Sequence, residues 1–130
     1  MKYSLDTNTI IALFKGHKSV WKNLERHSPL DCAVSSVVMH ELYFGAFKSA
    51  RVQENLDRIT ALRFTILEFE HEDARVSAEI RTSLSQAGTP IGPLDTLIAG
   101  QALARGLTVI SRNVREFSRI PGLAHENWEA

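Results

Sequence analysis

The sequence has few of the residues that mark disulfide-rich, zinc-cysteine or membrane proteins. Its single cysteine, Cys32, excludes an internal disulfide and any zinc site built from several cysteines. No apolar run approaches the roughly 20 residues that span a bilayer. The segment from Met1 to Asn8 also lacks the apolar core of a signal peptide. We therefore expect a cytoplasmic protein in a reducing compartment.

The sequence also lacks an excess of charge and any low-complexity segment. Lys plus Arg number 15 and Asp plus Glu number 15, so the formal net charge is zero. A nucleic-acid partner would have to be bound by local basic patches, because overall charge does not favour one. The 44% of hydrophobic residues indicates a globular protein with a real core. A chain of 130 residues is enough for one domain and too short for two, so we expect a single domain over residues 1–130.

Histidine pairs at metal-ligand spacing are absent as well. None of the histidines has another histidine three or four positions away; they are His17, His27, His40, His71 and His125. We therefore expect no histidine metal site.

Short apolar stretches alternate with amphipathic helical patterns along the chain. Strands are predicted at residues 2–5, 32–34, 64–67 and 107–110, each followed by a helical pattern. This alternation predicts an α/β fold, a parallel sheet of four to five strands with helices on both faces. Residues 123–128 are expected to form a short tail packed on the body. In such sheets ligands bind beyond the carboxyl ends of the strands.

The stretch from Gly92 to Gly100 predicts a helix with an acid at its start. Pro93 suits the first helical position because its missing N–H has no helical partner there. Asp95 stands at the head of the apolar stripe that continues through Ile98 and Ala102. Asp95 either caps the helix, with a stabilisation of about 0.3–1 kcal/mol from the helix dipole, or meets a positive group.

Three further acids occupy comparable positions: Asp6, Glu41 and Glu116 each follow a predicted strand. Carboxylates gathered at one place raise one another's pKa unless a cation is present. Without a histidine pair or a cysteine cluster, the natural cation is Mg²⁺, with Mn²⁺ as the other candidate. Such a site is suited to phosphodiester hydrolysis. From spacing alone, only an acidic metal site of this kind is predicted.

Several stretches, in this order, resemble the VapC-type PIN-domain toxins: residues 5–8 (LDTN), 41–46 (ELYFGA), 91–100 (IGPLDTLIAG), 109–117 (VISRNVREF) and 121–123 (PGL). The resemblance implies an α/β PIN domain and a Mg²⁺-dependent endoribonuclease, with tRNA among the candidate substrates. It also implies a VapB-type antitoxin encoded beside it, a homodimer, and contact with operator DNA only through the antitoxin.

Carried over by position, the resemblance assigns catalytic and metal-binding roles to Asp6, Glu41 and Asp95. Glu116 stands where many members of the family have Asp, which leaves open whether it touches the metal directly or through water. Supporting polar roles fall to Asn8, Ser111 and Asn113.

Other interpretations of the acids stay open. A phosphatase or phosphoacceptor could use Asp6 as its nucleophile, although no lysine stands near a later strand end. A non-catalytic binding module would use the acids only as helix caps. Asn113 and Glu116 could also form a capping box, in which the Glu side chain accepts from the N–H of the capping residue.

The basic and aromatic residues allow two interpretations each. Arg112, Arg115 and Arg119, with Arg105 expected nearby, either bind phosphate beside the acids or form a solvated helix face. The large aromatic residues are expected to pack in the core rather than stack on bases: Trp21, Phe44, Phe47 and Trp128. Gly45 and Ala46 are expected where helices approach closely, in the core or at a dimer contact.

Overall fold

A computed structural model describes residues 1–130 and contains one five-stranded sheet in the order β3-β2-β1-β4-β5. Every pairing between neighbouring strands is parallel. The strands are β1 (Tyr3–Leu5), β2 (Cys32–Ser35), β3 (Thr65–Leu67), β4 (Thr108–Ile110) and β5 (His125–Glu126). The predicted α/β architecture is therefore confirmed.

The helices fill the intervals between the strands. They are α1 (Thr7–Phe14), α2 (Lys18–Glu25), α3 (Ser36–Phe47), α4 (Val52–Thr60), α5 (His71–Gln86), α6 (Pro93–Arg105) and α7 (Val114–Phe117), with a 3₁₀ turn at Pro29–Asp31. The start of α6 at Pro93 is as predicted, and the helix ends at Gly106, whose φ of 66° is the left-handed conformation that glycine adopts freely. No helix is both long enough and apolar enough to cross a bilayer.

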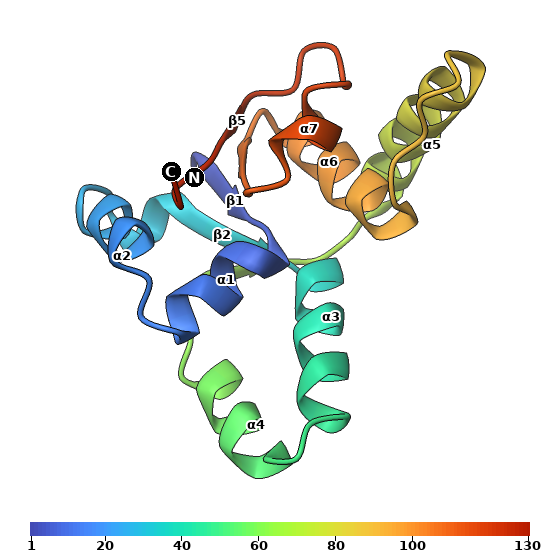
Figure 1. Cartoon of the computed structure of the whole chain (residues 1–130). Helices are drawn as coiled ribbons and strands as arrows, with labels where there is room; N and C mark the ends of the chain where they lie inside the picture. Colours follow the sequence, from blue (N-terminus) through green and yellow to red (C-terminus); the bar gives the residue numbers. More distant parts are fainter.

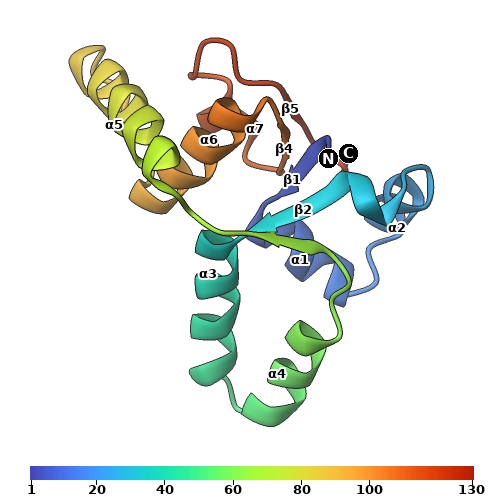
Figure 2. The same ribbon diagram turned by 180° about the vertical axis from the view of Figure 1, so that it is seen from behind.

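Two apolar clusters lie on opposite faces of the sheet. Alternate strand residues divide between them, with Val34 in the first cluster and its neighbour Ala33 in the second. Helices α1 to α4 supply most of the first cluster, and the helical residues of the second come from α5, α6 and α7. The two sets of helices lie on opposite sides of the strands in both views (Figures 1 and 2).

Helices α5 and α6 approach each other closely at Gly100. A Cβ atom placed on Gly100 would lie 2.7 Å from the Cα of Ser77, so only glycine fits here. By contrast, a Cβ on Gly45 in α3 would meet nothing within 4 Å. The expectation of a tight approach at Gly45 is therefore wrong for the isolated chain, whereas Ala46 is buried in the core as expected.

The C-terminal segment is more ordered than a packed tail. His125 and Glu126 pair with Val109 and Ile110 as the edge strand β5. Trp128 then packs against Tyr3, with their ring centroids 5.3 Å apart. The two chain ends therefore lie side by side (Figures 1 and 2). A strand of two residues is too short to show the alternation that marks a strand in a sequence.

The expectation that the large aromatic residues pack in the core holds only for Trp128, which is 2% exposed. It is wrong for Phe44 and Phe47 on α3, which are 60% and 63% exposed, and for Trp21, which is 43% exposed. Helix α3 carries apolar residues around most of its circumference, so its periodicity does not show which side meets the core.

Candidate active site

The carboxyl ends of three neighbouring strands meet at one edge of the sheet. Strand β1 leads directly into Asp6, β2 leads into α3, and β4 leads into Ser111. Leu5 and Ile110 are paired across β1 and β4, so the residues that follow them emerge side by side. This edge is where a parallel sheet places its ligands.

Asp6 is buried at the start of α1 and is held by three donors. Its Oδ1 accepts from the Thr7 N–H at 2.8 Å, which makes Asp6 the N-cap of α1. Its Oδ2 accepts from the Ser111 hydroxyl at 2.8 Å and from the Asn8 amide at 3.3 Å. Burial raises the pKa of Asp6, and these hydrogen bonds offset only part of the effect.

Glu41 reaches the same edge from the second turn of α3. Its neighbours Val38 and Leu42 are buried in the core, which leaves Glu41 on the side of the helix that faces α1. There its Oε1 accepts from the Thr7 hydroxyl at 2.8 Å. Thr7 therefore positions Glu41, a role that the sequence did not reveal because the two residues are 34 positions apart.

Asp95 and Glu116 form a carboxyl pair bridged by Asn113. The Asn113 amide donates to Asp95 Oδ2 at 3.3 Å and to Glu116 Oε2 at 3.0 Å. The two carboxyl groups lie close enough to form a hydrogen bond when Asp95 is protonated. Burial raises the pKa of Asp95 to about 7, reinforced by this bond and by the charges of Asp6, Glu116 and Glu41. The bond from Asp95 lowers the pKa of Glu116.

This pairing rules out the predicted capping box at α7. Asn113 does occupy the N-cap position, but its N–H donates to the Ser111 hydroxyl at 2.9 Å rather than to Glu116. The Glu116 side chain instead points toward Asp95 and Gly92. Glu116 therefore belongs to the acidic group and not to a local helix cap.

The predicted supporting residues connect the acids into one network. The Ser111 hydroxyl donates to Asp6 and accepts from both the Asn113 N–H and the Asn8 amide. Asn8 Oδ1 accepts from the N–H of Arg112 at 3.2 Å, which ties the loop after β4 to α1. The structure thus brings together all seven residues expected at this place: Asp6, Asn8, Glu41, Asp95, Ser111, Asn113 and Glu116.

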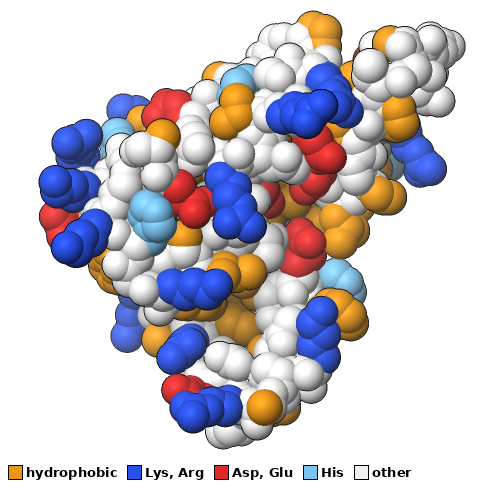
Figure 3. Space-filling model, in the orientation of Figure 1, with side chains coloured by type: hydrophobic (Ala, Val, Ile, Leu, Met, Phe, Trp, Pro, Cys, Tyr) orange, Lys and Arg blue, Asp and Glu red, His pale blue; other side chains and the backbone are white.

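Three of the four predicted arginines lie near the acids, and the fourth, Arg105, does not. Arg119 donates to the Pro90 carbonyl at 3.0 Å and helps to lower the pKa of Glu116 after its hydrogen bonds. Arg112 and Arg115 have exposed side chains close to the acids in sequence. Arg105 is not near the site, because it donates to buried Asp73 at 2.8 Å between α5 and α6. On the surface, acidic side chains border a hollow between α7 and α3, with Lys and Arg side chains around it (Figure 3).

The donor set suits a hard divalent cation. No three His, Cys, Asp or Glu side chains form a ready-made cage. Mg²⁺, however, is commonly bound through one or two carboxylates and keeps several waters. Burial and the neighbouring carboxylates raise the pKa of Asp95, and Arg119 offsets only part of this crowding at Glu116, so the group is suited to take up a cation. These carboxylates fit a Mg²⁺ ion with a partly retained water shell.

Comparisons with known proteins agree with this geometry. A family model described as "PIN domain" matches residues 3–123. The chain is 37% identical to the tRNA(fMet)-specific endonuclease VapC of Salmonella typhimurium over 98% of each chain. It is 38% identical to Ribonuclease VapC2 of Rickettsia felis over 99% of each chain. Among solved structures, it superposes on the DNA-bound VapBC of Salmonella typhimurium with a TM-score of 0.92, at 35% identity and over 98% of each chain.

Proposed function

The chain belongs to the PIN-domain family, and on that premise we propose that it is a Mg²⁺-dependent endoribonuclease acting as the toxin of a toxin–antitoxin pair. The observation that carries the proposal is the meeting of four carboxylates at the carboxyl edge of the sheet, where Thr7, Ser111 and Asn113 hold them by hydrogen bonds. A protein that used these acids only as helix caps would have no reason to bring them together.

Asp6, Glu41, Asp95 and Glu116 are the residues that would hold the ion, Mg²⁺ or alternatively Mn²⁺. When bound, the ion supplies activation of water and neutralisation of charge at the scissile phosphate. Ser111 and Asn8 keep Asp6 in one orientation, and Thr7 does the same for Glu41. Asn113 holds Asp95 beside Glu116, and a proton on Asp95 would have to leave before its carboxylate could hold the cation.

The proposed substrate is RNA. The name of the Salmonella relative makes tRNA the first substrate to test. Arg112, Arg115 and Arg119 are proposed to contact its phosphates, because they lie in or next to α7 beside the acids. An enzyme acting on such RNA would work in the cytoplasm.

The proposed partners follow from the relatives. The solved relative is a VapBC complex bound to DNA, and we assign to this chain a VapB-like antitoxin through which operator DNA would be contacted. A homodimer is also proposed, because exposed Phe44 and Phe47 on α3 form an apolar surface that a protein partner would cover. Residues 1–130 would act as a single PIN domain.

The rival enzymatic interpretation, with Asp6 as a nucleophile, is disfavoured by the geometry. Asp6 is 2% exposed, and both of its oxygens accept hydrogen bonds. Little of the carboxylate is therefore accessible for in-line attack on a phosphorus atom, although its three donors leave one lone pair on Oδ1 for a cation.

The proposal can be tested with purified, antitoxin-free protein and total cellular RNA. Cleavage should require Mg²⁺ or Mn²⁺, and sequencing of the new ends should show defined sites. Asp95→Asn should abolish cleavage, while Asp57→Asn, an equal charge change on exposed α4, should leave it intact. Cleavage that persists in EDTA, or equal activity in the two variants, would remove the basis for the metal site.

A further inference from the structure

A pocket of about 280 Å³ opens beside the candidate active site, between α1, α3 and α4. Glu41 lines one end of it, so the pocket and the acidic group share a residue. The volume of the pocket is slightly below the range of about 300–1,000 Å³ that is typical of small-molecule sites. A group of the size of one nucleobase would therefore fill much of it.

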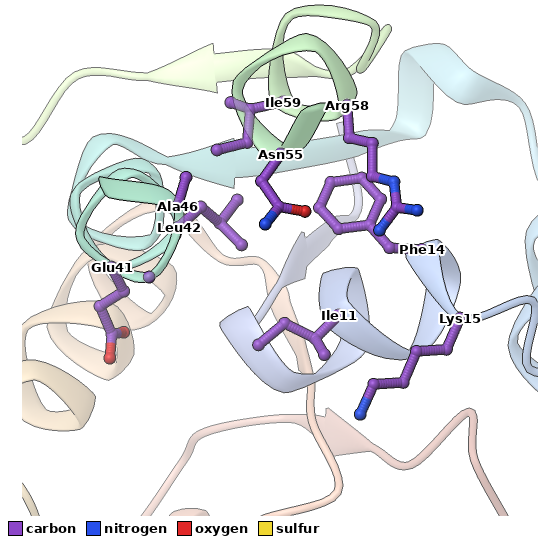
Figure 4. Close-up of a pocket in the computed structure, with 10 residues that line it drawn as sticks. Ile11, Phe14, Lys15, Glu41, Leu42, Ala46, Asn55, Arg58 and Ile59 are labelled. Carbon is purple, nitrogen blue, oxygen red and sulfur yellow. The ribbon is translucent and has the colours of Figure 1, made fainter. Parts of the chain in front are cut away.

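The walls of the pocket are apolar and include an aromatic ring. Ile11 and Phe14 line it from α1, Leu42 from α3 and Ile59 from α4. Figure 4 shows the Phe14 ring facing the same space as the Asn55 side chain. Such walls suit the flat apolar faces of a nucleobase. Any base can stack on an aromatic side chain, so this contact does not depend on the RNA sequence.

One polar group in the pocket has a defined orientation. The Ser49 hydroxyl donates its proton to the Ala46 carbonyl at 2.7 Å, so it can only accept from Asn55. The Asn55 amide nitrogen is therefore the atom that lies 2.9 Å from Ser49 Oγ. This leaves Asn55 Oδ1 as a hydrogen-bond acceptor within the pocket (Figure 4).

Two cations lie at the rim of the pocket. Lys15 comes from the end of α1 and Arg58 from α4. Arg58 pairs with Glu54 at 3.3 Å, but both side chains are about half exposed. An exposed pair of this kind contributes only about 0–1 kcal/mol, so a phosphate can compete for the guanidinium.

We propose that this pocket binds one unpaired base of the RNA substrate, adjacent to the phosphate that is cut. The inference rests on the proposed ribonuclease function. It combines apolar walls, an acceptor aimed inward, cations at the rim and continuity with the acidic group through Glu41. Asn55 Oδ1 would accept from the exocyclic amino group of adenine, cytosine or guanine, whereas uracil has no amino group and could offer only its single N3–H, so amino-bearing bases would be preferred. Asn55 is then a specificity-determining residue.

Gly45 offers a way to fill the pocket without disturbing the core. It lines the pocket, and a Cβ at this position meets nothing within 4 Å. Gly45→Leu should therefore fold, because its Cβ meets no neighbouring atom and leucine has a higher helix propensity than glycine. Gly45→Ala is the matched control, since it gives a similar gain in helix propensity while leaving most of the space open.

The experiment uses a library of short single-stranded oligoribonucleotides with randomised sequence. Binding is measured in EDTA and cleavage in Mg²⁺, followed by sequencing of the ends. We expect Gly45→Leu to bind about tenfold more weakly than wild type, since stacking of one base is worth about 1–3 kcal/mol. Gly45→Ala should bind as wild type does. The rise in Tm on adding Mn²⁺ should be the same in all three proteins, because the carboxylates are untouched.

Asn55→Leu tests the acceptor itself. The preference for amino-bearing bases over uracil at one position beside the cut should fall about three- to tenfold, the value of one neutral hydrogen bond. Ser49→Ala is its control, because it removes the same Ser49–Asn55 bond and keeps the acceptor; since the Asn55 amide is then free to turn, a smaller loss of preference is expected than in Asn55→Leu. A similar loss of preference in both variants would assign the effect to loop packing and overturn the role of Asn55.

The outcomes separate the two proposals. If wild type cuts no RNA in Mg²⁺, the ribonuclease function itself fails. If wild type cuts and Gly45→Leu binds and cuts with the same ends, the pocket does not hold a base. If Gly45→Leu cuts normally but escapes neutralisation by the antitoxin, the pocket is a peptide site and the inference is overturned.

Discussion

Asp95→Asn removes one charge from a crowded acidic group, so its main physical effect without metal is on stability. The pKa of Asp95 is raised from an ordinary 3.8 to about 7, first by burial. A raised pKa means that the folded state holds this proton more tightly than the unfolded state does. The stabilisation is complete below the ordinary pKa and is lost as the pH rises from about 4 to about 7. Asparagine does not titrate, so the Asp95→Asn variant does not lose stability in this way.

The magnitude follows from the same displacement. Each pKa unit corresponds to about 1.36 kcal/mol, so the full change from 3.8 to about 7 sets an upper bound of about 4 kcal/mol. Asp95 is only half-buried, and the lowered pKa of Glu116 acts in the opposite direction. Discounting for solvent screening leaves about 1–2 kcal/mol. For a domain of this size the difference in Tm is about 3–8 °C.

The assay is thermal unfolding in EDTA at pH 5 and pH 8, with Asp57→Asn as the control for a change of net charge. As the pH rises from 5 to 8, the Tm of wild type should fall more than the Tm of Asp95→Asn. The variant should then be the more stable protein at pH 8. Excess Mg²⁺ should then raise the Tm of wild type more than that of the variant. If Asp95→Asn were clearly less stable than wild type at pH 8 in EDTA, Asp95 would be a structural cap and the crowding argument would be wrong.

Four further outcomes are expected. Gly100→Ala should destabilise the fold by about 1–3 kcal/mol in chemical denaturation because it forces Ser77 and α5 away from α6, and an unchanged midpoint would show that the helices can separate freely. Glu116→Gln should keep its stability but cleave more weakly at limiting Mg²⁺, whereas full activity there would remove Glu116 from the metal site. RNA products should carry 5′-phosphate and 3′-hydroxyl ends, since activated water and not the ribose 2′-OH attacks; a 2′,3′-cyclic phosphate would contradict this. Expression of the chain alone should arrest bacterial growth while Asp6→Ala does not, and equal harmlessness of the two would count against the toxin function.

Local chemistry was sufficient to predict most of the elements. The alternation of apolar strands with helical patterns, Pro93 at the start of α6 and Gly106 at its end are all short-range signals, and each is confirmed. The positions of Asp6 and Asp95 at element ends could be predicted for the same reason. Their joint placement needed only one further rule, that parallel strands end at the same edge.

Long-range pairing decided what short-range patterns could not. The capping box at α7 failed because Asp95, distant in sequence, takes the Glu116 side chain. Arg105 pairs with Asp73 because α5 packs on α6, which places it away from the acids.

The sequence by itself determined the types and ends of the elements, because the signals that set them lie within a turn or two of the chain. Only the tertiary structure decided that Ser111 holds Asp6, a contact between residues 105 positions apart. It also decided that Asn55 faces a pocket shared with Glu41, and that Phe44 and Phe47 stay exposed on α3. The physical reason is that a helix shows its own periodicity in sequence, whereas the surface that each of its sides meets depends on the packing of the whole chain.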